Sequence, residues 1–185
     1  MPELPEIEIV RRSLFKMINK AKILNIVINN KNLRYKIPHT FFVDLKNEQI
    51  LKISRRSKYL IFKLKKKLLL LHLGMTGKLL LLKNKSNTIL KTSFYYDTNI
   101  LQKHNHIYFF LNNGIVLIYN DVRRFGFFKL YENLDLEKIT FLKKLGPEPF
   151  SNLFDVKYFI KFIKNILKDF FYKSFIISMI GFHLI

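Results

Sequence analysis

The first part of the chain carries a helical hydrophobic pattern. After Pro5, apolar residues recur near helical spacing and basic residues occupy another face, which predicts an amphipathic helix from about Pro5 to about Lys20. Proline tolerates the first helical turn, and Glu6 in that turn complements the positive end of the helix dipole. Glu3 is expected just outside this helix.

From Lys22 to Tyr131 the pattern changes to short runs rich in Ile, Leu, Phe and Tyr, separated by turn signals. So many closely spaced strands indicate a two-layer sandwich or barrel with the first helix packed against it. Residues 83–103 are polar and predict a long loop. The predicted strands are Ile23 to Asn29, Ile50 to Arg55, Tyr59 to Leu64, Leu68 to Leu73, Lys78 to Leu82, His106 to Leu111, Ile115 to Asn120 and Phe127 to Tyr131.

The composition shifts again at about Asn133. Residues 136–145 and 155–167 have a helical period, and Gly146-Pro147-Glu148-Pro149, which no helix crosses, separates them. The final run, residues 174–185, is almost uncharged. Such a run is typical of a helix that needs an apolar packing partner.

The charge balance points to a polyanionic partner. The 185 residues include 33 Lys and Arg against 13 Asp and Glu, a net charge of +20. This favours nucleic acid over an anionic membrane surface. The acidic start and the strand-length apolar runs predict neither a secretory signal nor a spanning helix, so we expect a cytoplasmic protein with no membrane partner. The chain contains no cysteine, which excludes disulfides, thiolate metal sites and a cysteine nucleophile.

The N-terminus is the first candidate for chemistry. If Met1 is removed, Pro2 presents a secondary α-amine, and α-amines have a pKa near 8, so an appreciable fraction is nucleophilic at neutral pH. Attack on a sugar C1′ would give an iminium directly. Glu3 would serve as the proton donor if burial raised its pKa. The alternative is a simple helix start.

Lys58 is the second candidate, between two predicted strands. Its flexible amine suits a phosphate contact or a general acid–base role. The alternative is a solvated charge of the kind that blocks edge-to-edge strand pairing.

Two turns carry side chains suited to a base stack. Gly74 and Gly77 allow a tight turn with Met75 at its tip, and an exposed apolar tip suits insertion between bases. Arg123 and Phe125 share a later turn, where Arg pairs with a base edge or phosphate and Phe wedges between bases. The alternatives are a hairpin with its Met packed back onto the sheet and a salt-bridged turn.

His104 and His106 have the same-face spacing of a strand, which raises a metal site as a possibility. No third ligand is evident in the sequence, so we predict no metal. A histidine in a basic groove more simply donates to phosphate.

Taken together, these motifs occur in one order along the chain. Their set and order closely resemble the formamidopyrimidine-DNA glycosylase family, the bacterial base-excision enzymes for oxidised purines, over essentially the whole chain. Leu4 resembles this family more than its relative endonuclease VIII, whose start usually carries Gly there. The motifs are Pro2-Glu3-Leu4-Pro5-Glu6-Ile7-Glu8, Arg56-Ser57-Lys58-Tyr59-Leu60, His72-Leu73-Gly74-Met75-Thr76-Gly77, Lys103-His104-Asn105-His106, Asp121-Val122-Arg123-Arg124-Phe125-Gly126 and Leu145-Gly146-Pro147-Glu148-Pro149.

The resemblance implies an α+β fold. It places an N-terminal helix plus an antiparallel β-sandwich catalytic domain at residues 1–132, and a partial helix–two-turn–helix DNA-binding domain at residues 133–185. Family members then carry a structural zinc in a C-terminal four-cysteine finger. That finger is absent here because the chain has no cysteine, so we expect no cofactor in this chain.

The resemblance also implies roles for the catalytic candidates. Pro2 would be the Schiff-base nucleophile at C1′, Glu3 the proton donor, and Lys58 the acid–base lysine near the lesion. Extrusion of a base requires unstacking energy of a few kcal/mol, so such an enzyme also needs groups that hold the duplex open.

The same resemblance supplies those DNA contacts. Met75, Arg123 and Phe125 would fill the gap left when the damaged nucleotide flips out, with Arg123 facing the orphaned base. His104 would contact the DNA backbone. Lys164 would match the family's DNA-contacting lysine in the early helical region.

Two departures from the family pattern stand out. Val122 replaces the Pro usual in its loop. Residues 175–183 resemble the approach to the family's Gly-Asn-Ile-Tyr segment, but the phosphate-holding Asn is not there. We therefore expect a C-terminally truncated family member.

The leading hypothesis is a bifunctional DNA glycosylase and AP lyase for base excision repair. It would remove 8-oxoguanine and formamidopyrimidines from double-stranded DNA, as a monomer associated with the bacterial nucleoid. The first alternative is a truncated, catalytically impaired DNA-binding remnant of that enzyme. A basic RNA-binding protein would explain the charge but not the ordered motifs.

Overall fold

The computed structural model describes residues 2–83, 88–90, 101–132 and 136–181. It forms two compact units, Met1–Lys144 and Leu145–Ile185, which are described separately. The predicted domain boundary at residue 132 stays a prediction. In chain order the first unit contains α1 (Leu4–Ile18), β1 (Ile23–Ile28), α2 (Phe41–Leu45), β2 (Ile50–Arg56), β3 (Tyr59–Leu64), β4 (Lys67–His72), β5 (Lys78–Lys83), β6 (Thr88–Leu90), the 3-10 turn η1 (Gln102–His104), β7 (Asn105–Leu111), β8 (Ile115–Asn120), β9 (Phe127–Glu132), the 3-10 turn η2 (Leu136–Lys138) and α3 (Thr140–Lys143).

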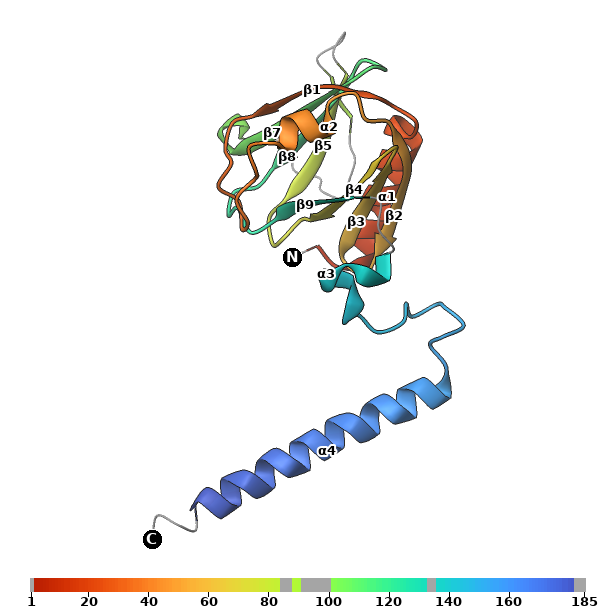
Figure 1. Ribbon diagram of the computed structural model, residues 1–185, viewed down its shortest axis with the longest axis vertical. Helices are drawn as coiled ribbons and strands as arrows, with labels where there is room; N and C mark the ends of the chain where they lie inside the picture. The colour runs from red at the N-terminus through yellow and green to blue at the C-terminus, as the bar shows by residue number, and fades with distance from the viewer. Residues whose placement is uncertain (1, 84–87, 91–100, 133–135, 182–185) are drawn as a thin grey trace. The chain divides into compact units, whose positions relative to one another are not determined.

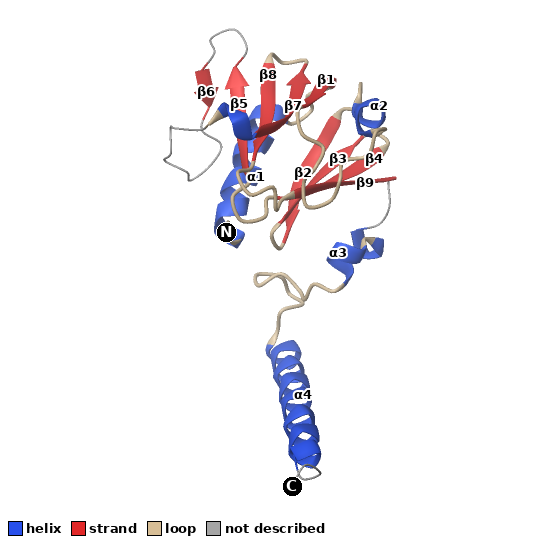
Figure 2. Ribbon diagram, turned by 90° about the vertical axis from the view of Figure 1, so that its left-hand side faces the viewer, coloured by secondary structure: helices blue, strands red, loops and turns tan. Residues whose placement is uncertain are grey.

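The strands form two antiparallel sheets (Figures 1 and 2). One sheet has five strands in the order β1-β7-β8-β5-β6, and the other has four in the order β2-β3-β4-β9. In the second sheet Tyr59 on β3 lies opposite His72 on β4, and His72 lies opposite Phe127 on β9. This register gathers three ring side chains at one end of the four-stranded sheet.

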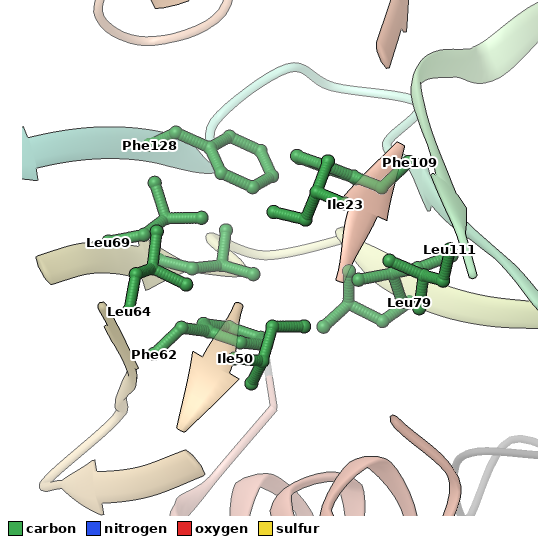
Figure 3. A pocket seen from close by; sticks show the side chains of 11 residues that line it. Ile23, Ile50, Phe62, Leu64, Leu69, Leu79, Phe109, Leu111 and Phe128 are labelled. Carbon is green, nitrogen blue, oxygen red and sulfur yellow. The ribbon is translucent and has the colours of Figure 1, made fainter. Parts of the chain in front are cut away.

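The main core contains apolar residues of both sheets and of α1. Leu69 and Phe128 of the four-stranded sheet share it with Leu79 and Leu117 of the five-stranded sheet. Figure 3 shows the side chains that meet there around a cavity of about 10 Å³. A cavity of this size has room for about one water molecule and no ligand. The interior of the sandwich is therefore packing rather than a binding site.

Helix α1 covers the outside of this core beside β2 and β3 (Figure 1). Its buried residues are Ile7, Val10, Leu14 and Ile18, which recur every three or four positions and form one apolar stripe. Burial of this stripe fixes the rotation of the helix. The N-terminal end of α1 is thereby held close to the four-stranded sheet.

The α+β class with a helix and an antiparallel sandwich is confirmed, and all eight predicted strands are present within one residue at each end. Two expectations were wrong, and α2 was not predicted. Residues 83–103 were predicted as a loop, but strand β6 lies within them, and the rest of that prediction, on residues 84–87 and 91–100, lies outside the described residues. Residues 136–145 form two short turns of helix, η2 and α3, instead of one helix.

The second unit contains α4 (Val156–Gly181), which is longer than the predicted helix over residues 155–167. The Asp155 carboxylate accepts a hydrogen bond from the Tyr158 backbone N–H at 2.7 Å and so caps its first turn. Lys164 is exposed on this helix. Among the described helices, none is long and apolar enough to cross a membrane.

Candidate functional site

The start of α1 places the first predicted site residues. Glu3 is the N-cap residue in an extended conformation (φ −90°), just outside the helix as predicted. Its backbone N–H donates to the Glu6 carboxylate at 2.6 Å, which satisfies a donor that the helix itself leaves unpaired. Pro2 is buried directly before it. The capping interaction thus fixes the backbone that carries both Pro2 and Glu3.

Lys58 lies in the two-residue turn between β2 and β3. Ser57 adopts a left-handed backbone (φ 51°), as tight hairpin turns require. The Lys58 Nζ lies 2.6 Å from the Glu3 Oε2, and these side chains are 28% and 60% exposed. Glu3 and Lys58 are therefore in contact, and Pro2 is bonded to Glu3.

Glu8 anchors α1 beside this turn. Its carboxylate pairs with Arg11 at 2.7 Å and Arg12 at 2.9 Å on the same helix, and with Arg55 of β2 at 3.3 Å. Hydrogen bonding to Arg11, aided by Arg12 and Arg55, outweighs desolvation and lowers the pKa of Glu8 from 4.5 to about 2. The contact with Arg55 ties α1 to the strand that ends at the Lys58 turn. The spacing Glu8, Arg11, Arg12 was the available sequence signal for this cluster.

A group of rings lies at the same end of the sheet. His72 stacks on Phe127 with ring centroids 5.6 Å apart, and Tyr59 tilts against His72 at 5.0 Å. Burial lowers the pKa of His72, with smaller contributions from the positive charges of Arg34 and Lys58. His72 is thus a packed side chain that contacts Tyr59 and Phe127 directly before the turn that follows β4.

That turn presents Met75. Gly74 has a left-handed backbone (φ 66°), and its N–H donates to His72 Nδ1 at 3.1 Å. Met75 is 42% exposed at the tip, so the alternative in which it packs back onto the sheet is not what the structure shows. An exposed apolar tip of this kind is available to a partner.

The loop between β8 and β9 presents Arg123 and Phe125. The Arg123 guanidinium carbon lies 4.5 Å from the centre of the Phe125 ring, a cation–π contact. Phe125 is 42% exposed. This loop adjoins the Met75 turn, because a Cβ added to Gly74 would lie 2.5 Å from the Gly126 nitrogen. Met75 and Phe125 are therefore carried by neighbouring loops.

A basic hollow of about 580 Å³ opens beside the Phe125 loop. Arg34, Arg123 and Arg124 line it together with Asn32 and Phe125. Three guanidinium groups and one ring suit a phosphodiester or a base edge. Asn32 and Arg34 were not among the predicted site residues, and no sequence pattern joins them to a loop so distant along the chain.

His104 and His106 do not share a strand face, and that expectation was wrong. His104 ends η1, and its carbonyl accepts a hydrogen bond from the Asp121 N–H at 3.0 Å, next to the Phe125 loop. His106 is buried in β7, with its Nε2 2.7 Å from the Asp121 carbonyl oxygen.

No metal site is apparent in the described part of the chain. Within the described ranges, no three His, Asp or Glu side chains are placed to hold a metal ion. The 185 residues offer no thiolate, so a four-cysteine zinc site cannot form within them. Lys164 lies on α4 in the second unit, whereas the other predicted site residues lie in the first unit.

Comparison with known proteins places this geometry in a family. A family model described as the formamidopyrimidine-DNA glycosylase N-terminal domain matches residues 1–128. The chain belongs to this family. A formamidopyrimidine-DNA glycosylase of Bartonella tribocorum is 42% identical over 170 residues, which cover 89% of this chain and 57% of that relative. One of Streptococcus agalactiae is 36% identical over 168 residues, 91% of this chain and 57% of the relative. The chain thus spans little more than half the length of the curated relatives it matches.

Solved structures of formamidopyrimidine-DNA glycosylases agree with this assignment. A Lactococcus lactis enzyme bound non-covalently to DNA containing an AP site has a TM-score of 0.73 and 33% identity, covering 89% of this chain and 58% of that one. Another structure from Lactococcus lactis, an inhibited enzyme with DNA containing an N7-benzyl-Fapy-dG, has a TM-score of 0.73, 34% identity and coverages of 89% and 56%.

Proposed function

We propose that this chain is a DNA glycosylase with AP-lyase activity, which removes 8-oxoguanine and formamidopyrimidines from double-stranded DNA in base excision repair. The observation that carries the proposal is the 2.6 Å contact between Lys58 and Glu3, the residue that follows Pro2 in the chain. A carboxylate and an ammonium group are in contact, and removal of Met1 would add an α-amine on the residue bonded to Glu3, which completes the set that an iminium mechanism requires. The proposed setting is the bacterial cytoplasm, with the protein acting as a monomer.

The first step uses Pro2 as the nucleophile. Once Met1 is removed, the Pro2 nitrogen attacks C1′, the glycosidic bond breaks, and the leaving base takes a proton from the Lys58 ammonium group. Glu3 accepts the proton released by the Pro2 nitrogen and delivers it to O4′. The C1′–O4′ bond then opens and leaves an iminium between C1′ and Pro2.

The second step breaks the strand. Lys58, now neutral, removes a proton from C2′, and the bond between C3′ and the 3′ phosphate oxygen breaks with the phosphate as leaving group. Water hydrolyses the iminium and frees Pro2. The contact between Nζ and Oε2 supports these roles, because it places the two proposed proton-transfer groups at one point of the surface, where both would face the same sugar.

The exposed loops supply the second requirement, access to the damaged base. Met75 and Phe125 would occupy the stack from which the nucleotide leaves, and Arg123 would face the orphaned base. His104 would contact the backbone beside this loop. Lys164 on α4 is proposed as a further DNA contact of the second unit. The net charge of +20 and the basic hollow favour a polyanionic partner for this surface.

Borohydride trapping tests the proposal. The protein is incubated with duplex DNA that carries one 8-oxoguanine, in the presence of borohydride, after mass spectrometry has confirmed that Met1 is removed. The expected result is a covalent adduct with the wild type and much slower trapping with Pro2→Gly, because the imine that a primary amine forms carries a positive charge only when it is protonated. Pro38→Gly makes the same change at an exposed proline before α2, so it serves as the matched control and should trap normally.

Two outcomes would count against the proposal. Binding without any adduct, on both 8-oxoguanine and abasic duplexes, would favour the non-catalytic DNA-binding protein. Equal binding to RNA and to undamaged DNA, with steep salt dependence and no adduct, would favour a general basic nucleic-acid binder.

A further inference from the structure

Asp121 is a buried carboxylate that the proposed mechanism does not use. It follows the last residue of β8 and is 0% exposed. A buried charge is tolerated only when it is well hydrogen-bonded. The donors that surround Asp121 come from two separate loops and from Tyr119 of β8, and their distribution indicates what the residue does.

The first carboxylate oxygen reaches across to the Met75 turn. Thr76 Oγ1 donates to Asp121 Oδ1 at 2.5 Å. The Arg123 backbone N–H lies 3.2 Å from the same oxygen and 3.1 Å from Thr76 Oγ1. Asp121 Oδ1 and the Thr76 hydroxyl therefore join the turn that presents Met75 to Arg123, at the start of the loop that presents Phe125.

The second oxygen fixes the other end of the Phe125 loop. Asp121 Oδ2 accepts from the Gly126 N–H at 2.9 Å and from the Tyr119 hydroxyl at 2.8 Å. Gly126 is confined there, because a Cβ added to it would collide with the Tyr119 hydroxyl oxygen. The loop from Arg123 to Gly126 is thus held at both ends by one side chain.

The apolar side chains on the two loops are exposed, unlike this polar centre. Met75 and Phe125 are each 42% exposed, whereas the Asp121 side chain between their loops is buried. Groups that must enter a base stack together bind better when their relative position is set in advance, because less ordering is needed on binding.

We propose that Asp121, through Thr76 and the Gly126 backbone, is a positioning residue that makes the Met75 turn and the Phe125 loop insert into the duplex as one unit. This inference rests on the proposed function. The inference adds to the proposed function a coupling between Met75 and Phe125, which Asp121 supplies and neither side chain supplies by itself.

Thr76→Val tests the coupling with little change of shape, because it removes the hydroxyl that crosses between the loops. We expect single-turnover excision of 8-oxoguanine from duplex DNA to slow about 10-fold to 100-fold, the effect of losing one hydrogen bond to a charged group. The fluorescence change of a 2-aminopurine placed beside the lesion, which reports unstacking, should fall in parallel. Thr76→Ser retains the hydroxyl and should restore both signals.

A double-mutant cycle separates coupling from simple stability. In the wild-type background the effects of Met75→Ala and Phe125→Ala on the 2-aminopurine signal should be non-additive, and in the Thr76→Val background they should add. Additive effects in both backgrounds would overturn the proposal. Equal slowing by Thr76→Val on duplex 8-oxoguanine and on a single-stranded abasic site, where no base is extruded, would also overturn it and indicate damage to the fold.

The two experiments distinguish failure of the loop coupling from failure of the proposed function. Failure of the wild type to trap DNA would remove the glycosylase mechanism, while the 2-aminopurine cycle on an abasic duplex would still report whether the two loops act together. A normal adduct with an additive cycle would remove the coupling alone.

Discussion

The Lys58 Nζ and the Glu3 Oε2 lie 2.6 Å apart, although 55 positions of sequence separate the two residues. Two local structures create this contact: a capped helix start that holds Glu3 and a two-residue hairpin turn that holds Lys58. The Glu8–Arg55 ion pair at 3.3 Å joins the helix to the strand before the turn. The relative position of Glu3 and Lys58 therefore depends on the helix start, on the hairpin turn and on the Glu8–Arg55 ion pair that joins the helix to the strand.

Lys58→Gln should slow base excision by about 10²-fold to 10⁴-fold, the usual contribution of a general acid–base group. Its effect on stability should be small, because an ion pair with a partner that is 60% exposed stabilises a protein by at most about 1 kcal/mol. Single-turnover kinetics and thermal unfolding measure the two effects. Lys63→Gln, which removes the same charge from β3, should change neither. Unchanged excision in Lys58→Gln would exclude Lys58 from the chemistry.

Phe125→Ala should weaken binding to an abasic duplex about 5-fold to 150-fold, because stacking of a base on an aromatic ring contributes about 1–3 kcal/mol. Phe15→Ala removes a ring of similar exposure, 45% against 42%, from α1 and should leave binding unchanged. Fluorescence anisotropy gives the dissociation constants. Equal losses in the two variants would mean that Phe125 has no specific place in the duplex.

Arg34→Gln and Arg124→Gln should each reduce the slope of log K against log salt concentration by about 1, the value for one lost phosphate contact. The reason is that both guanidinium groups line the hollow beside Phe125. Titrations at several salt concentrations measure the slope. Lys16→Gln on α1 is the matched loss of one charge, and a slope that falls by the same amount there would show a general charge effect.

The Glu8 cluster should make stability depend on pH in the acid range. The pKa of Glu8 is lowered to about 2 in the folded protein, so its contribution to the free energy of unfolding is present above about pH 4.5 and is lost as the pH falls through 2. Glu8→Gln should lower the free energy of unfolding at neutral pH by about 1–3 kcal/mol and flatten the acid decline.

Urea unfolding at a series of pH values checks this prediction. Glu132→Gln removes a carboxylate that is 76% exposed and 3.5 Å from Lys67, and it should leave the acid decline in place. An unchanged decline in Glu8→Gln would mean that the cluster does not hold α1 on the sheet.

Most of the sandwich could be predicted from the sequence because its strands are bounded by strong turn signals. Asn112-Asn113-Gly114 separates β7 from β8, and Gly114 has the left-handed backbone (φ 76°) that such a turn needs. Helix α2 escaped prediction because its five residues are too few for a helical period to be visible. Strand β6 escaped because its three residues lie in a polar stretch.

The site was predictable only in part. Glu3 and Lys58 belong to recognisable motifs, and the structure brings them into contact. Arg34 and Asp121 act through tertiary contacts: Arg34 meets the Phe125 loop across the hollow, and Asp121 accepts hydrogen bonds from two loops. No periodicity or spacing along the chain encodes such contacts, because only the packing of the two sheets creates them.

The most direct test of the central claim is the position of the trapped adduct. After borohydride reduction with an abasic duplex and proteolysis, mass spectrometry should find the DNA-derived group on the N-terminal peptide, at the Pro2 nitrogen. Lys58 carries the neighbouring amine, so the two candidates fall on different peptides. An adduct on Lys58, or none although the protein binds the duplex, would contradict the account.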